Sequence, residues 1–349
     1  MNDLLIHSTT YFDGQKLFPN SWALIGESSF EVGQGDGWKS LDSTETLAAP
    51  DRILLAGLVD THCHGAMGHS AQDGLEGMRA TLDFNQQNGV ALSLLSMVSA
   101  PPVELIRLSE LAQELRGDSR FAGIHLEGPY LAHEKRGAHD PSFVGPPKTA
   151  DLVEFAKLQT VRSITIAPEL FEQSQIDILV DSGIQLCFGH SEATYEQASE
   201  FFSRYPSAIM THAFNGMRGI HHRAPGPVPA AIEAGVDVEL IADGIHVEAG
   251  PARLLPKDHV ILITDAMSAT GMPDGQYNLG SMSATVTGGI ARTDSGSLAG
   301  STLVLADAVK RYGDWVDDLE AALRAASTSP ARSYGLEIPG LSLKNYTLL

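Results

Sequence analysis

The chain has 349 residues, of which 43% are hydrophobic and 19% charged, a composition typical of a globular protein with a sizeable core. It carries 23 Lys and Arg against 43 Asp and Glu, so its formal net charge is -20. This excess of acidic residues argues against nucleic acid or an anionic membrane as a partner, since both require a basic surface.

The two cysteines, Cys63 and Cys187, are too few for a disulfide framework. Both fall in strand-like segments, which indicates buried thiols in a reducing compartment. The sequence has neither an export signal pattern nor an apolar run of about eighteen residues. We therefore expect a soluble, cytoplasmic protein.

Apolar segments of two lengths follow one another along the chain. Residues 1–51 contain short runs between turn formers, which predicts small antiparallel strands. From residue 52 onward, runs of strand length alternate with amphipathic stretches of helix length. The expected strands are Ile53–Thr61, Val90–Val98, Phe121–Leu126, Val161–Ala167, Ile184–Gly189, Ala208–Thr211, Val236–Ala242 and His259–Thr264. The expected helices are Leu75–Gln87, Val103–Leu115, Leu152–Leu158, Gln173–Ser182, Tyr195–Ser203, Pro229–Ala234, Ala249–Leu254, Leu303–Arg311 and Trp315–Ala326.

Eight strand–helix units over residues 52–275 favour a closed parallel barrel. An open, doubly wound sheet is the alternative, but no Gly-x-Gly-x-x-Gly follows the first expected strand. Residues 276–300 read as a hairpin that joins the N-terminal strands, 301–334 as the last barrel helices, and 335–349 as the end of the small domain. The expected fold is α/β: a TIM-like (β/α)8 barrel with a small β-sandwich domain built from both ends of the chain.

Residue types that bind metal ions occur where several expected strands end. His62 and His64 are two residues apart, and alternate residues of a strand project from one face. Because the C-terminal ends of barrel strands meet at one rim, the polar residues found there should converge. Imidazole and carboxylate groups hold divalent metals and transfer protons. The further candidates at strand ends are Glu127, His190, His212 and Asp265.

Each candidate also has an ordinary structural explanation. The histidine pair could be structural, Glu127 could belong to a buried salt bridge, and Asp265 could cap a turn. His190 could stand at the entry to a helix, and His212 shares that alternative. His125 shares the inward face of Glu127 but lies deeper in the strand, so we expect it to be structural.

The segment Met217–Arg223 is locally basic in a very acidic chain. A solvated loop is the default interpretation. Its position directly after His212 favours anion binding, and the guanidinium of Arg223 suits a phosphate through its fork of donors.

In a series of motifs, the chain resembles the N-acetylglucosamine-6-phosphate deacetylases, a family of the amidohydrolase superfamily. The resemblance covers nearly the whole chain, in order. The motifs are His125-Leu126-Glu127-Gly128-Pro129, Gly137-Ala138-His139, Gly189-His190-Ser191-Glu192-Ala193-Thr194, His212-Ala213-Phe214-Asn215-Gly216-Met217, Ala242-Asp243-Gly244-Ile245-His246, Thr264-Asp265-Ala266 and Leu298-Ala299-Gly300-Ser301.

The resemblance implies roles for these residues. Glu127, His190 and His212 would hold the principal metal ion, and Asp265 would act as general base and then as general acid. His62 and His64 leave room for a second metal, with Glu127 as the bridge. His139 would assist catalysis by stabilising the oxyanion. The implied substrate contacts are Ala138, His139, Asn215, Gly216, Arg223, His246, Leu298 and Ala299.

The implied activity is deacetylation of N-acetylglucosamine 6-phosphate to glucosamine 6-phosphate and acetate, in amino-sugar catabolism. The cofactor would be a divalent metal, with Zn2+ preferred over Fe2+, and one or two ions per subunit. The partners would be the sugar phosphate and a second copy in a homodimer, with Arg223 acting in its own subunit or across the interface. The alternatives are a deacetylase of N-acetylgalactosamine 6-phosphate, another amidohydrolase, and a non-enzymatic sugar-phosphate sensor.

Overall fold

Eight parallel strands form the central sheet of the computed structural model, which describes residues 3–349. The first and last strands meet through a bridge between Cys63 and Ala266, and the Asp265 N–H donates to the His62 carbonyl at 2.8 Å. The sheet therefore closes on itself, and the expected (β/α)8 barrel is confirmed. In sheet order the strands are β6 (Leu58–Cys63), β9 (Val90–Val98), β10 (Phe121–Glu127), β11 (Val161–Ile166), β12 (Gln185–Phe188), β13 (Ile209–Met210), β14 (Val238–Ile241) and β15 (Val260–Ile263).

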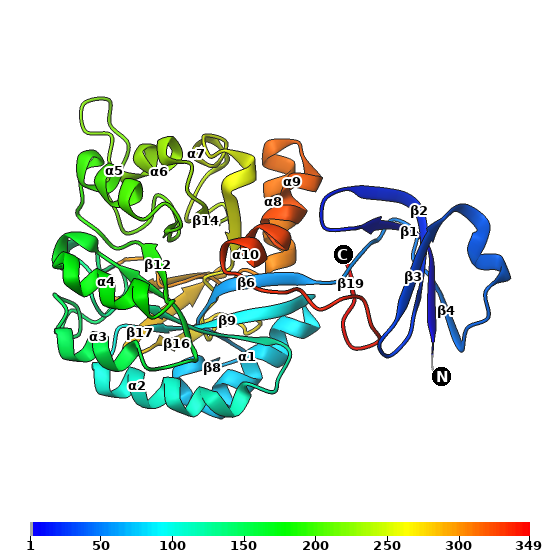
Figure 1. Cartoon of the computed structure of the whole chain (residues 1–349), viewed down its shortest axis with the longest axis horizontal. Coiled ribbons are helices and arrows are strands. Elements are labelled where there is room, and N and C mark those ends of the chain that lie inside the picture. The colour runs from blue at the N-terminus through cyan, green and yellow to red at the C-terminus, as the bar shows by residue number, and fades with distance from the viewer. Residues whose placement is uncertain (1–2) are drawn as a thin grey trace.

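Helices pack around the outside of this barrel (Figure 1). Strands covered on both faces need continuous apolar runs, and all nine residues of β9 are buried accordingly. The helices are α1 (Leu75–Gln87), α2 (Pro102–Leu111), α3 (Thr149–Phe155), α4 (Gln173–Asp181), α5 (Tyr195–Arg204), α6 (Pro227–Ala234), α7 (Ala249–Ala252), α8 (Leu305–Val316), α9 (Leu319–Ala325) and α10 (Thr328–Ser333).

The last helices differ from the expected ones. Helix α8 continues to Val316, whereas the sequence suggested a break after Arg311. The break falls at Asp317, which has the left-handed φ of 50°. The Asp318 carboxylate then accepts the Ala321 N–H and caps α9. Helix α2 also ends early, in a 3-10 turn over 112–115.

A smaller β domain lies beside the barrel, next to the start of β6 (Figure 1). Both ends of the chain build it, because β19 (Thr347–Leu348) pairs antiparallel with β5 (Ile53–Leu55). A small domain from both ends was expected. Its six strands are hydrogen-bonded in one sheet, where the sequence suggested a sandwich. The other strands are β1 (Leu4–Phe12), β2 (Leu17–Ile25), β3 (Phe30–Gln34) and β4 (Glu45–Ala48).

The hairpin of residues 276–300 does not join that domain, and this expectation was wrong. Its strands β16 (Gly275–Leu279), β17 (Met282–Thr287) and β18 (Ile290–Thr293) form a separate three-stranded sheet. The apolar face of this sheet packs on Met267 and Val98, which follow or end barrel strands. The segment therefore covers the C-terminal rim of the barrel, at the opposite end from the small domain. Another short hairpin, β7 (Gly65–Ala66) with β8 (His69–Ser70), follows His64.

No helix in residues 3–349 is both long enough and apolar enough to cross a membrane.

Candidate active site

The predicted metal and base residues gather at the C-terminal rim of the barrel. Each stands in the last two residues of a strand or within two residues after it, so side chains distant in sequence reach one point. All six are buried. They are His62, His64, Glu127, His190, His212 and Asp265.

Three of these residues have left-handed backbone conformations, which residues other than glycine rarely adopt. The φ angles are 48° for His190, 25° for His212 and 50° for Asp265. Such conformations cost on the order of 1–3 kcal/mol each and cluster at functional sites. The neighbouring loop requires Gly216, because a Cβ there would lie 2.8 Å from the Nδ1 atom of His190. The backbone at this rim is therefore shaped to present side chains to one point.

Glu127 lies at the centre of the cluster. Its Oε1 is 2.9 Å from His212 Nε2 and 3.0 Å from His190 Nε2, and those two nitrogens are 3.1 Å apart. Its Oε2 is 3.2 Å from His64 Nε2, which lies 3.2 Å from His62 Nε2. We call Glu127, His190 and His212 the principal group, and His62, His64 and Glu127 the second group. In each group the possible ligand atoms lie within 4.8 Å of one another.

The donor atoms of the principal group fit a bound cation. Ligands about 2.0–2.1 Å from a zinc ion lie roughly 2.9–3.4 Å from each other, as these atoms do. His190 Nδ1 donates its hydrogen to the Lys135 carbonyl at 2.7 Å. In that neutral tautomer the Nε2 lone pair faces the Glu127 carboxylate, an arrangement that a divalent ion between them stabilises.

Asp265 borders both the candidate metal ligands and the open cavity. Its Oδ1 lies 3.1 Å from His64 Nε2 and 3.6 Å from His62 Nε2. Burial raises the pKa of the Asp265 carboxyl, but the hydrogen bond to His64 and the charge of His62 outweigh burial, and the net pKa is below its usual value. An ionised carboxylate in this position can accept a proton from a water molecule.

His139 faces Glu127 from the other side. The Ser99 N–H donates to His139 Nδ1 at 3.1 Å, so the neutral ring carries its hydrogen on Nε2, 3.2 Å from Glu127 Oε2. Burial lowers the pKa of His139 to about 4. His139 is therefore built as a neutral hydrogen-bond donor. His125, in contrast, is enclosed: its ring nitrogens contact Ser96 and Thr165 at 2.9 and 2.8 Å, which agrees with the structural role expected for it.

A cavity of about 230 Å³ opens above this cluster. His62 is fully buried beneath its floor. Ala299 is outside its wall, because the Ala299 N–H donates to the Ala291 carbonyl and its side chain packs under the hairpin of β17 and β18. The other predicted residues that line the cavity are His64, Glu127, Ala138, His139, His190, His212, Asn215, Gly216, His246, Leu298 and Asp265.

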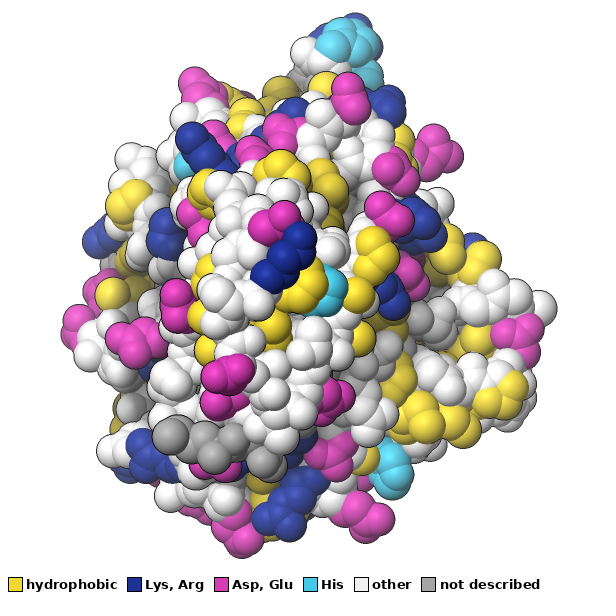
Figure 2. Space-filling view, turned by 90° about the vertical axis from the view of Figure 1, so that its right-hand side faces the viewer, with side chains coloured by type: hydrophobic (Ala, Val, Ile, Leu, Met, Phe, Trp, Pro, Cys, Tyr) yellow, Lys and Arg dark blue, Asp and Glu magenta, His cyan; other side chains and the backbone are white. Residues whose placement is uncertain are grey.

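Arg223 is another predicted substrate contact that does not line the cavity. It lies in a stretch, 218–224, in which every residue is exposed. The segment between β13 and α6 extends from the body as a loop beside α5 (Figure 1). Histidine and basic side chains stand together on a projection at the top of the molecule (Figure 2). Arg223 Nη1 contacts its neighbour His222 at 2.7 Å.

Supporting residues were missed by the sequence analysis. Asp243 accepts from His246 Nδ1 at 2.6 Å, which leaves His246 Nε2 for a ligand. Asp60 accepts from the Thr264 hydroxyl at 2.6 Å, and burial raises the pKa of Asp60 to about 6. Glu239 contacts His62. Asp60 and Glu239 each interrupt an apolar strand with a charge, and that signal could have identified them.

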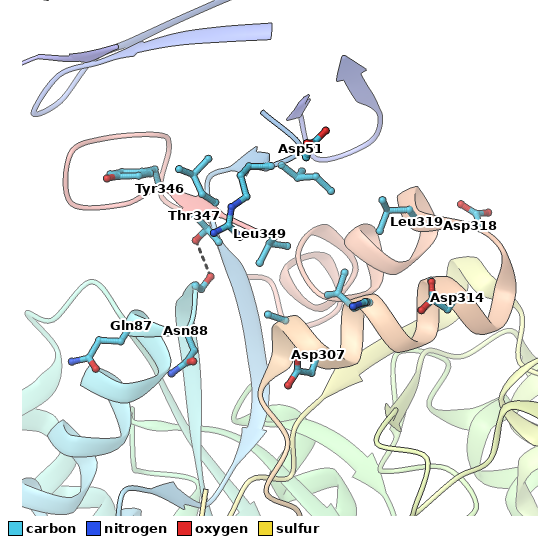
Figure 3. A pocket seen from close by; sticks show the side chains of 18 of the residues that line it. Asp51, Gln87, Asn88, Asp307, Asp314, Asp318, Leu319, Tyr346, Thr347 and Leu349 are labelled. Carbon is cyan, nitrogen blue, oxygen red and sulfur yellow. Dashed lines mark hydrogen bonds between the residues drawn. The ribbon is translucent and has the colours of Figure 1, made fainter. Parts of the chain in front are cut away.

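A larger cavity, of about 1030 Å³, lies elsewhere, between the start of the barrel and the small β domain. Figure 3 shows carboxylates from both sides of it, among them Asp51, Asp307 and Asp314. These three side chains are exposed. Solvated carboxylates of this kind are ordinary on a protein surface. The buried, convergent donors are at the opposite end of the barrel.

The barrel and its rim of histidines and carboxylates define a hydrolase of the amidohydrolase class. No family model matches the chain. Relatives do: the N-acetylglucosamine-6-phosphate deacetylase of Vibrio furnissii is 34% identical over 81% of this chain and 74% of its own length. The N-acetylgalactosamine-6-phosphate deacetylase of Escherichia coli O157:H7 is 35% identical over 82% of this chain and 79% of its own length. The chain belongs to the N-acetylglucosamine-6-phosphate deacetylase family.

Solved structures agree with this family assignment and with the fold. A mutant of the N-acetyl-D-glucosamine-6-phosphate deacetylase of Mycobacterium smegmatis, solved in complex with N-acetyl-D-glucosamine-6-phosphate, superposes with a TM-score of 0.91 at 32% identity, over 100% of this chain and 95% of that one. The β-aspartyl dipeptidase of Fervidobacterium islandicum superposes with a TM-score of 0.60 at 16% identity, over 100% and 92% of the two chains, and shares the fold alone. The expected family and fold are therefore confirmed.

Proposed function

We propose that this chain hydrolyses N-acetylglucosamine 6-phosphate to glucosamine 6-phosphate and acetate, as part of amino-sugar catabolism in the cytoplasm. The observation that carries the proposal is the convergence of Glu127, His190, His212 and Asp265 at the floor of one cavity, in a member of this deacetylase family. N-acetylgalactosamine 6-phosphate is the second candidate substrate, because a relative of almost equal identity is named for it.

The principal group is proposed to hold one divalent ion, Zn2+ in preference to Fe2+. Such an ion supplies Lewis acidity and lowers the pKa of water. Asp265 takes a proton from the attacking water as general base, and later returns that proton to the departing amine as general acid. His139 donates its Nε2 hydrogen to the acetamido oxygen as negative charge develops there.

The sugar phosphate is proposed to lie in the cavity against the remaining lining residues. His246 offers Nε2 because Asp243 fixes its other nitrogen. Asn215 and the backbone of Gly216 border the same space, as do Ala138 and Leu298. The cavity wall of one subunit lacks Arg223, so we propose a homodimer in which that side chain reaches the phosphate bound to the partner subunit.

The direct test is acetate release by the zinc-loaded protein. We expect turnover with one or both hexosamine 6-phosphates, and a much lower kcat/KM with N-acetylglucosamine itself, because the phosphate contributes binding energy to the transition state. Equal rates with and without the phosphate would favour another amidohydrolase reaction. Ligand binding without any acetate release would favour a sugar-phosphate sensor. Comparing the two hexosamine phosphates decides the sugar.

Replacement of Arg223 tests the phosphate contact. Arg223→Ala removes a charged, bidentate donor, and we expect kcat/KM for the phosphorylated sugar to fall about 10- to 100-fold, since a hydrogen bond to a charged group contributes about 1.5–3 kcal/mol. The non-phosphorylated sugar should lose little. The measurement is steady-state kinetics with both substrates, with Arg79→Ala on the exposed face of α1 as the control.

Mixed dimers test whether this contact crosses the interface. Arg223→Ala subunits, whose activity is reduced, and Asp265→Asn subunits, which are nearly inactive, are unfolded and refolded together. An intact Asp265 and a partner's Arg223 then meet in one of the two sites of each mixed dimer, so activity should return. No recovery, with mixed dimers present by mass spectrometry, would place Arg223 in its own subunit.

A further inference from the structure

A buried carboxylate lies beneath the second group. Glu239 lies on β14, inside the barrel, and is 1% exposed. Its Oε2 is 3.3 Å from His62 Nδ1. Its Oε1 accepts from the Tyr334 hydroxyl at 2.7 Å and from the Thr61 hydroxyl at 3.3 Å. Both oxygens therefore have partners, and one of those partners is a histidine of the second group.

This contact determines which nitrogen of His62 carries hydrogen. A carboxylate only accepts hydrogen bonds, so His62 Nδ1 must donate to Glu239. The lone pair of the neutral ring is then on Nε2, which lies 3.2 Å from His64 Nε2 and 3.6 Å from Glu127 Oε1. The His62 side chain is fully buried, so water cannot replace Glu239 as its partner.

The other histidines do not depend on a side chain in this way. His190 donates from Nδ1 to the backbone carbonyl of Lys135, and a substitution of the Lys135 side chain would not remove this acceptor. The Nδ1 atoms of His64 and His212 have no hydrogen-bond partner within the described residues. His62 is therefore the ligand candidate whose orientation and tautomer one buried side chain controls.

We propose that Glu239 is a positioning residue for the second group: it holds His62 with the lone pair on Nε2, the orientation in which that group can bind a divalent ion. The inference rests on the metal-dependent hydrolase function proposed above. Carboxylates hydrogen-bonded to metal-ligating histidines fix the ring and raise its basicity, and their loss typically lowers metal affinity about 10- to 100-fold. The principal group does not include His62 and keeps its ion without Glu239.

The variant Glu239→Gln tests this role with almost no change of volume. In this variant the Tyr334 hydroxyl should continue to donate its hydrogen bond, now to the amide oxygen of Gln. Its other neighbour, the Cys187 sulfur 3.6 Å away, is a weak acceptor and does not compete. The amide nitrogen then faces His62 Nδ1, which must accept. The His62 hydrogen moves to Nε2, where it blocks the metal.

Two further variants separate positioning from general damage. Tyr334→Phe removes a hydroxyl from the same buried cluster but leaves both oxygens of Glu239, so the second ion should remain. The double variant Glu239→Gln with Tyr334→Phe frees the amide to turn its oxygen toward His62, so the second ion should return. A purely structural role for Glu239 predicts that the double variant is worse than either single variant.

The experiment measures Zn2+ alone. The full-length protein is stripped with a chelator, titrated with Zn2+, and assayed for bound zinc per subunit by elemental analysis, with circular dichroism and retention of the first equivalent as checks of folding. We expect two equivalents for the unchanged protein, Tyr334→Phe and the double variant, and an affinity for the second equivalent lowered about 10- to 100-fold in Glu239→Gln.

Three results would overturn the proposal: one equivalent in the unchanged protein, a tight second equivalent in Glu239→Gln, or equal loss in Tyr334→Phe. If Glu239→Gln does not fold, the test uses the double variant, provided that it folds. Loss of the second zinc equivalent in the double variant would contradict the proposal. The zinc titration does not depend on acetate release. If the deacetylase assay fails, the zinc stoichiometry can therefore still be interpreted by itself.

Discussion

Asp265→Asn is expected to reduce kcat by about 10²- to 10⁴-fold, the range that a positioned general acid or base contributes. The Asp265 carboxylate is next to the candidate metal ligands, with Oδ1 3.1 Å from His64 Nε2, and it borders the cavity in which the substrate would lie. An amide of the same shape cannot take a proton from water and return it to the amine. KM should change much less than kcat, because binding of the sugar phosphate uses other side chains.

The metal content of Asp265→Asn separates loss of the base from loss of the site. Glu127 and the four histidines remain, so bound zinc per subunit should match that of the unchanged protein. Asp177→Asn, the same chemical change on the exposed face of α4, is the control and should retain full activity. Unchanged turnover in Asp265→Asn would remove the base assignment, and loss of zinc would identify Asp265 as a ligand instead.

The sequence was sufficient to predict the barrel and the convergence of its rim residues. Eight apolar runs separated by helical stretches have few other compact solutions, and parallel strands of a closed barrel bring their ends to one side. A residue such as Glu127, at the end of its strand, is placed by that rule alone. His190, His212 and Asp265 stand slightly beyond their strands, and their left-handed backbone angles direct them to the same point.

The partners of those residues were not predictable from local patterns. Glu239 contacts His62 across 177 positions of sequence, and only the closed barrel brings them together. The hairpin of 276–300 alternates apolar and polar residues, which predicts a half-buried sheet but not the surface that covers it. It packs on Met267 and Val98 at the barrel rim, with which its apolar residues form one buried cluster.

Arg223 illustrates a different gap. Sequence position correctly associated it with the loop after His212, and that loop does border the cavity through Asn215 and Gly216. The tip of the loop, however, extends away from the body of the molecule (Figure 1). A pattern in one chain carries no information about which subunit a projecting side chain serves.

Glu127→Gln is expected to have the broadest effect of any single substitution, because Glu127 belongs to both groups. Its Oε1 faces His190 and His212 while its Oε2 faces His64. An amide has one oxygen and no charge. One group therefore loses a ligand oxygen completely, and the other keeps only a neutral oxygen in place of an anionic one. Removing a direct ligand should lower metal affinity at each group by at least the roughly 10- to 100-fold typical of lost supporting contacts. Deacetylation should fall with it.

A zinc titration tests whether Glu127 serves both groups. Titration of the stripped Glu127→Gln protein with Zn2+ should show both equivalents weakened, whereas His62→Ala should weaken the second alone and His190→Ala the first. Glu154→Gln, an exposed change on α3, should bind zinc like the unchanged protein. One tight equivalent retained in Glu127→Gln would mean that one group holds its ion without this carboxylate. In that case, Glu127 would not be a shared ligand, and the distances of about 3 Å around it would reflect hydrogen bonding among buried side chains rather than a metal centre.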